Sequence, residues 1–298
     1  MPSSRSGSPT SRDSEAVSDA VRDPVRPLGP AVGALAFKLA TAPWLVAQAR
    51  QTRRHAHVLP EAAGPREGRL GEGHGRALRL LIVGDSSAAG VGVAEQHQAV
   101  TGHLTRALQR ALDAPLEWHL RARSGLSTKG VHEMLRADPP PPADIAVVIT
   151  GVNDVIGLVA PRRALAHRAA LAGWLQGTCA IRHVVFAPLP PIERFPLLPA
   201  LLRRVMGDDA RRHDLALSRW AKGRDDVSHV EIELDVRPAV MASDGFHPGE
   251  PVYRICGEAL ALHTATTIDR LERYGTLGPS RDAQGERPQR TQRPQETP

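Results

Sequence analysis

Serine, aspartate, histidine, asparagine and glycine recur in four short blocks, each of which follows a run of apolar residues. In chain order the blocks are GDSSAAGVG at 84–92, RSG at 123–125, GVND at 151–154 and SDGFHP at 243–248. Together they supply a hydroxyl, a glycine amide, a carboxamide, a carboxylate and an imidazole. Acyl transfer requires a nucleophile, a base, a group that orients the base, and donors for an oxyanion. The blocks therefore predict acyl-transfer chemistry if the fold brings them together.

The elements that must position these blocks can be read from residues 77–275, which alternate short apolar runs with longer stretches of helical spacing. Strands are expected at 78–83, 116–122, 144–150, 183–187 and 230–234, and helices at 98–112, 128–136, 161–176, 198–221 and 248–273, the fourth with a break near Gly207. This alternation predicts an α/β domain in which helices cover both faces of a parallel five-stranded sheet. Sites in such sheets lie outside the carboxyl ends of the strands, where four of the five expected strands meet a block.

The remaining segments differ from this pattern. Residues 1–27 and 276–298 are polar and lack apolar periodicity, so disordered tails are expected there. Residues 55–76 contain two prolines and five glycines, which predicts a linker or an extended arm. Residues 28–54 are largely apolar and predict an N-terminal helix packed on the domain surface, with a membrane-associated helix or a cleaved export signal as the alternatives. We expect a cytoplasmic protein, associated with a membrane if that helix meets one.

The charge balance looks at first like that of a nucleic-acid-binding protein, because 38 basic and 32 acidic residues give a net charge of +6. Only Lys38, Lys129 and Lys222 are lysines, however, and the arginines are scattered without interleaved aromatic residues. Nucleic-acid binding is therefore not predicted. Two cysteines cannot form a disulfide framework, and the spacing of the histidines predicts no metal site. The first block lacks the Gly-Lys-Ser/Thr of a phosphate-binding loop, so no cofactor is expected.

The four blocks, in this order, resemble those of the SGNH hydrolase superfamily, the GDSL-like lipases and esterases. The resemblance rests on the Gly-Asp-Ser of the first block, on Gly125, on GVND and on DGFHP at 244–248, and it covers about residues 78–270. Ser87 stands where the usual pattern has leucine, which leaves the preceding serine unchanged. The resemblance implies a flavodoxin-like, three-layer α/β/α fold that works without a cofactor or a metal.

The resemblance also implies a role for each matching residue. Ser86 would be the nucleophile, placed where a helix begins so that its own N–H donates to the oxyanion. The Gly125 N–H and the Asn153 side-chain amide would complete the oxyanion hole. His247 would be the general base, and Asp244 would hold its ring in the correct tautomer.

Taken alone, the residues leave ordinary structural roles open. Ser86 could be a helix N-cap, a role expected in any case for Ser87, and Gly125 could be a turn glycine. Asp85 is expected to order its loop and Asp154 to be structural. It is the joint placement of the blocks at one edge of the sheet that favours catalysis.

These expectations converge on a carboxylic ester hydrolase that acts on small acyl esters through an acyl-enzyme on Ser86. Phe195, with Leu197 and Leu198, could line the acyl pocket or merely pack between helices. Two alternatives remain: a catalytically silent binding protein of the same fold, or an acyltransferase, lysophospholipase or thioesterase. The expected partner is a small-molecule acyl ester.

Overall fold

The computed structural model describes residues 59–72 and 76–273, and the predictions for 1–27, 28–54 and 276–298 lie outside these residues. The strands are β1 (Glu67–Leu70), β2 (Leu78–Gly84), β3 (Leu116–Ala122), β4 (Ile145–Ile149), β5 (His183–Phe186) and β6 (Val227–His229). The helices are α2 (Val100–Leu112), α3 (Thr128–Ala137), α4 (Val152–Ile156), α5 (Pro161–Cys179), α6 (Ala200–Ala221) and α7 (Glu250–Arg273), with 3₁₀ turns η1 (Ile192–Arg194) and η2 (Pro238–Val240).

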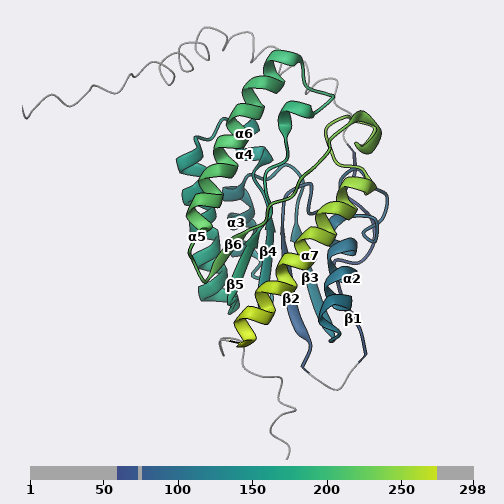
Figure 1. Cartoon of the computed structure of the whole chain (residues 1–298), viewed down its shortest axis with the longest axis vertical. Helices are drawn as coiled ribbons and strands as arrows, with labels where there is room; N and C mark the ends of the chain where they lie inside the picture. The colour runs from purple at the N-terminus through teal and green to yellow at the C-terminus, as the bar shows by residue number, and fades with distance from the viewer. Residues whose placement is uncertain (1–58, 73–75, 274–298) are drawn as a thin grey trace, which may run out of the picture. The chain divides into compact units, whose positions relative to one another are not determined.

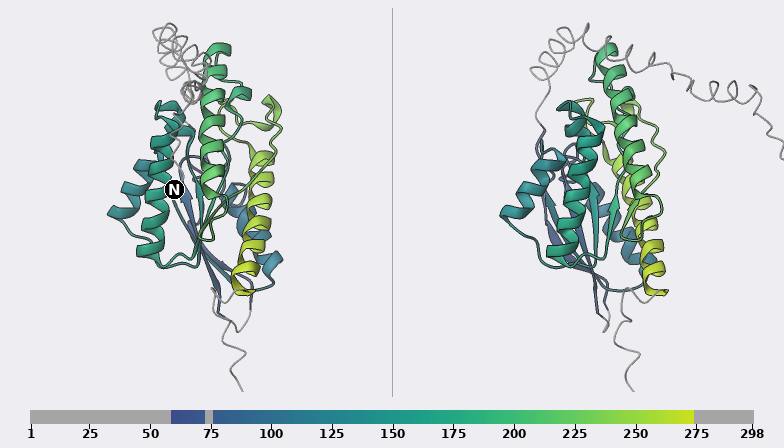
Figure 2. Two further views of the ribbon diagram at one scale, coloured as in Figure 1. Left: turned by 60° about the vertical axis from the view of Figure 1, so that its left-hand side comes forward. Right: turned by 90° about the vertical axis from the view of Figure 1, so that its left-hand side faces the viewer.

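The strands form one sheet in the order β1-β3-β2-β4-β5-β6, in which β2 to β6 are parallel (Figure 1). Successive residues of the central strand β2 point to opposite faces, as the pleat requires. Leu80 and Ile82 pack against α2 and α7, whereas Leu81 and Val83 pack against α3, α5 and α6. Figure 2 shows these two helical layers on either side of the sheet. Apolar residues on both faces of the parallel strands thus produce the three-layer α/β/α fold that the sequence predicts.

The five-stranded prediction misses β1. Glu67–Leu70 pairs antiparallel with β3, opposite Leu116–His119, so the sheet has six strands and an antiparallel edge. This part of 55–76 is therefore an edge strand and not a linker. Its side chains are mostly exposed, which removes the apolar alternation by which a strand is recognised.

Residues just before β1 contact the turn that carries the first block. Ala62 N–H donates to the Ala89 carbonyl at 3.2 Å. The carboxylate of Glu61 accepts the N–H of Ser124 at 2.6 Å, next to Gly125. The arm is thus attached to two of the four blocks.

Two other expectations are corrected. The last strand is Val227–His229 and not 230–234, because the polar Ser228 and His229 find side-chain partners that permit their partial burial: His183 and His263 for Ser228, and Asp214 for His229. Helix α6 continues through Gly207 without a break. A Cβ at Gly207 would lie 2.6 Å from Cβ of Glu193, so the glycine allows η1 to approach the helix closely.

Two smaller findings complete the fold. Cys179 is buried at the last residue of α5, and burial raises the pKa of its thiol. Within residues 59–72 and 76–273, no helix combines the length and the apolar character that a membrane crossing requires.

Candidate active site

The loops that follow β2 and precede α7 bring three of the predicted residues into one hydrogen-bonded chain. Ser86 Oγ lies 3.1 Å from His247 Nε2, and His247 Nδ1 lies 2.6 Å from Asp244 Oδ2. Ser86 and Asp244 are each 8% exposed. Residues 161 positions apart in the chain therefore meet with the hydroxyl, imidazole and carboxylate in the order that base-assisted nucleophilic attack requires.

Asp244 is fixed by its own loop. Its Oδ1 accepts the backbone N–H groups of Phe246 and His247, both at 2.9 Å, while Oδ2 is left for the imidazole. Gly245 has a φ of +63°, which turns the chain so that a carboxylate and an imidazole three residues apart can meet. Burial alone would raise the pKa of Asp244, but the hydrogen bonds from His247 and Phe246 outweigh it and lower that pKa. Asp244 is therefore held as the anion.

Ser86 lies on a tight turn and not at the start of a long helix. The Ala89 and Val91 N–H groups donate to the carbonyls of Asp85 and Ser86, each at 3.0 Å, and α2 begins only at Val100. The expectation that a helix begins at Ser86 is therefore wrong. So is the helix cap expected at Ser87, whose N–H donates to Asp85 Oδ1 at 3.0 Å.

Asp85 orders this turn from a fully buried position. It is 2% exposed, and among the described residues its second oxygen, Oδ2, finds no hydrogen-bond partner. Burial raises the pKa of Asp85 to about 6, against an opposing effect of the Ser87 N–H. The sequence predicts that Asp85 orders its loop, but it does not reveal that burial raises the pKa of this carboxyl group.

The two further residues predicted as oxyanion donors, Gly125 and Asn153, follow the strands that flank β2. Gly125 follows β3, is exposed and has a φ of +80°, and no described heavy atom lies within 4 Å of the position a Cβ would take. Asn153 lies in α4, directly after β4, and its Nδ2 donates to the Leu126 carbonyl at 3.1 Å. An amide nitrogen carries two hydrogens, so one remains for a ligand. Both residues therefore present donors at the edge of the sheet where Ser86 lies.

The segments that carry Gly125 and Asn153 also contribute to a cluster of buried polar side chains that the sequence does not predict. Asp154 pairs in it with Thr128 and Arg168, and Thr150 contacts these two partners through its hydroxyl and its carbonyl. The sequence predicts a structural role for Asp154 but does not identify these partners. The available signal was the position of Arg168 on the apolar stripe of α5, among Ala164, Leu171 and Leu175. A charged residue in such a stripe needs a buried partner.

An apolar cavity of about 70 Å³ lies between the sheet and α7. Ser87 and Pro248, the direct neighbours of Ser86 and His247, line one part of it, and Phe195 lines another. Phe195 packs edge-on against Phe246, with 5.2 Å between ring centroids, and Phe246 packs against the His247 ring at 5.1 Å. Leu198 does not line this cavity, although it belongs to the same apolar cluster as Phe195.

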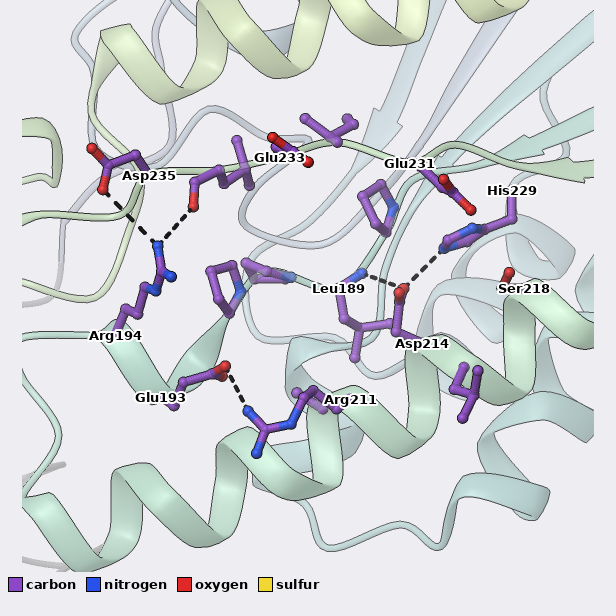
Figure 3. Close-up of a pocket in the computed structure, with 17 residues that line it drawn as sticks. Leu189, Glu193, Arg194, Arg211, Asp214, Ser218, His229, Glu231, Glu233 and Asp235 are labelled. Atoms are coloured by element: carbon purple, nitrogen blue, oxygen red, sulfur yellow. Dashed lines mark hydrogen bonds and ion pairs between the residues drawn. The ribbon is translucent and has the colours of Figure 1, made fainter.

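A larger groove of about 790 Å³ lies between α6 and residues 188–194 and 229–235, and none of Ser86, Asp244 and His247 lines it (Figure 3). Most of its charged groups pair with one another: Glu193 with Arg211, Asp235 with Arg194, and Asp214 with His229. The groove and the apolar cavity share the wall formed by Pro188, Pro190, Ile232 and Leu234. The larger space is therefore a neighbour of the candidate site and not the site itself.

The described part of the chain holds no cluster of three histidine, cysteine or carboxylate side chains placed to bind a metal ion. The arrangement of Ser86, His247 and Asp244 is complete as an acid–base and nucleophilic unit built from protein groups.

Known proteins resemble this chain in sequence and in fold. The GDSL-like esterase Rv1075c of Mycobacterium tuberculosis is 29% identical over 202 residues, which are 62% of this chain and 61% of that protein. The match thus spans about three fifths of the relative's length. The lipase Lip_vut3 from a goat rumen metagenome shares the fold, with a TM-score of 0.51 and 18% identity over 63% of this chain and 97% of that one.

The family comparison covers the site. The sequence profile of the GDSL-like lipase/acylhydrolase family matches residues 82–255, from within β2 to the first turns of α7. That range is more than half of the chain and contains all four blocks, so the resemblance and the fold class inferred from the sequence are confirmed. The chain belongs to the GDSL-like lipase/acylhydrolase family.

Proposed function

We propose that this protein is a serine ester hydrolase that cleaves small acyl esters through an acyl-enzyme on Ser86. The observation that carries the proposal is the continuous chain from Ser86 Oγ through His247 to Asp244, at 3.1 and 2.6 Å. Membership in a family of lipases and acylhydrolases supports it.

In the first half of the reaction, His247 Nε2 accepts the hydroxyl proton as Ser86 Oγ attacks the ester carbonyl carbon. The carbonyl oxygen becomes an oxyanion, which the N–H groups of Ser86 and Gly125 and the Asn153 amide would bind. When the tetrahedral species collapses, the bond to the alcohol breaks and His247 gives its proton to the departing oxygen. The products are a free alcohol and an acyl group bonded to Ser86 Oγ.

In the second half, water takes the place of the alcohol. His247 removes one proton from the water as its oxygen attacks the acyl carbon, and then returns a proton to Ser86 Oγ as that bond breaks. Asp244 stays ionised throughout and stabilises the imidazolium, in agreement with its lowered pKa. The cycle consumes only ester and water.

The apolar cavity beside Ser87 and Pro248 supports a short acyl chain. Its volume of about 70 Å³ is roughly half that of an engineered cavity of about 150 Å³ that takes up benzene. Phe195 contributes to its wall. A space of this size suits a short acyl chain better than a long one.

The test is the turnover of p-nitrophenyl acetate, butyrate and octanoate by the wild type, Ser86→Ala and Ser218→Ala. Ser218 lies on α6 in the larger groove and serves as the matched control. We expect Ser86→Ala to lose activity, Ser218→Ala to retain it, and mass spectrometry to find the acyl group on the peptide that contains Ser86. Equal rates for wild type and Ser86→Ala would exclude Ser86 as the nucleophile. An inactive wild type would favour the silent binding protein, and transfer of the acyl group to an added alcohol would favour an acyltransferase.

A further inference from the structure

Four buried polar side chains form a cluster that joins the segments of the two proposed oxyanion donors, Gly125 and Asn153. Asp154 Oδ2 accepts the hydroxyl of Thr128 at 2.5 Å, and the backbone N–H of Thr128 lies 3.3 Å from both oxygens of Asp154. Thr128 Oγ1 lies 3.0 Å from Thr150 Oγ1. Arg168 Nη2 lies 4.0 Å from Asp154 Oδ2 and 3.5 Å from the Thr150 carbonyl.

The cluster connects the two segments that carry the donors. Thr128 is the first residue of α3, three positions after Gly125, whereas Asp154 directly follows Asn153 in α4. A second tie runs parallel to the first, because Asn153 Nδ2 donates to the Leu126 carbonyl. The Asp154–Thr128 bonds therefore fix the distance between the loop after β3 and the loop after β4.

The burial of this cluster makes its geometry rigid. Thr128, Asp154 and Arg168 are each 0% exposed. Gly151 leaves the space that the guanidinium fills, since a Cβ there would lie 2.2 Å from Arg168 Nη2. A buried carboxylate that lost its partners would bear a large desolvation cost, so alternative placements of the loops are disfavoured.

We propose that Thr128, Asp154 and Arg168 are positioning residues that set the spacing between the Gly125 N–H and the Asn153 amide and thereby preorganise the oxyanion hole. The inference rests on the proposed function. Donors that are held in place stabilise the transition state more than the bound substrate, so their displacement lowers kcat more than it changes KM. None of the three positioning residues touches the substrate in this scheme.

The test compares Thr128→Val, which removes the hydroxyl at nearly constant volume, with Thr128→Ser, which keeps it. Thr267→Val is the matched control, because Thr267 is a buried threonine of α7 whose hydroxyl donates to the His263 carbonyl at 2.9 Å. For each variant, kcat and KM for p-nitrophenyl acetate, the inhibition constant of an alkyl boronic acid and the urea midpoint of unfolding are measured.

We expect Thr128→Val to lower kcat by roughly 10- to 100-fold and to raise the inhibition constant of the boronic acid, which mimics the tetrahedral state, by a similar factor. KM should change little, Thr128→Ser should restore most of kcat, and Thr267→Val should shift only the urea midpoint. A Thr128→Val variant that is less stable but keeps the wild-type kcat and boronic-acid affinity would overturn the inference. Failure of the proposed function is distinguishable, since it would appear as wild-type activity in Ser86→Ala.

Discussion

At the scale of single residues, the proposed mechanism depends on a hydroxyl, an imidazole and a carboxylate that act as one unit. In that mechanism, Ser86 Oγ attacks only while His247 Nε2 can accept its proton, and the contact between Asp244 and His247 Nδ1 leaves Nε2 facing Ser86. The sequence could identify these residues because their blocks have a recognisable order. It could not show that Ser86 lies on a turn closed by Ala89 and Val91, because backbone hydrogen bonds of this kind carry no residue signature.

The cooperation of Ser86 and His247 can be measured with a double-mutant cycle. Ser86→Ala and His247→Ala should each lower kcat by roughly 10⁴- to 10⁶-fold, and the double variant should be little worse than either. The measurement is ester hydrolysis at saturating substrate, after the folding of each variant has been checked by circular dichroism. Losses that multiply in the double variant would show that the two side chains act independently.

Because the pKa of Asp85 is raised, we expect its contribution to the free energy of unfolding to fall as the pH rises. Burial raises its pKa from 3.8 to about 6 in the folded protein, so the folded state binds a proton more tightly than the unfolded chain. The stability that this proton supplies is fully present below pH 3.8 and is lost as the pH rises through about 6. Relative to Asp85→Asn, the wild type should therefore lose about 2 kcal/mol of unfolding free energy between pH 4.5 and 7.5. Urea titrations at both pH values test this, and a constant difference between the two proteins would contradict it.

At the scale of elements, the parallel strands and the helices that cover them could be predicted well, because apolar runs and helical spacing are local properties. Leu116–Ala122, for example, forms β3 with the predicted bounds. Residues 230–234 are predicted as the fifth strand, as one of the short apolar runs between the helical stretches. Glu231 and Glu233 are exposed, but only Val230 bonds to a described strand, through its N–H to the Phe186 carbonyl of β5 at 3.0 Å; Ile232 and Leu234 line the apolar cavity instead.

We expect this wall to limit the length of the acyl chain that the protein accepts. Ile232 and Leu234 separate the cavity of about 70 Å³ from the groove of about 790 Å³. Ile232→Ala should open a passage between them, so that the ratio of kcat/KM for p-nitrophenyl octanoate to that for the butyrate rises by roughly tenfold, as two or more newly buried methylenes allow. Leu215→Ala is the control, because Leu215 lines the groove but not the cavity. An unchanged ratio in Ile232→Ala would show that the acyl chain does not occupy this cavity.

At the scale of the whole molecule, the predicted start of the domain at residue 77 can be compared with the structure. A domain that begins at residue 77 matches the start of β2, because apolar periodicity begins there. The preceding segment lacks that periodicity, yet Glu67–Leu70 forms β1 and Glu61 and Ala62 bond to the active-site loops. Polar backbone contacts between distant segments leave no pattern in the sequence, so this part of the domain could not be recognised before the structure.

The attachment of the arm has a practical consequence for anyone who shortens the chain. A fragment that starts at residue 77 would uncover the hydrogen-bonding edge of β3, including the N–H and carbonyl groups opposite Glu67–Leu70, and Trp118, against which Gly68 packs. Uncovered strand edges recruit other chains, so size-exclusion chromatography should show self-association of this fragment but not of one that starts at residue 59. The shorter fragment should also hydrolyse esters poorly even where it stays monomeric. It lacks Glu61, whose carboxylate accepts the N–H of Ser124 and so holds the loop that contains Gly125.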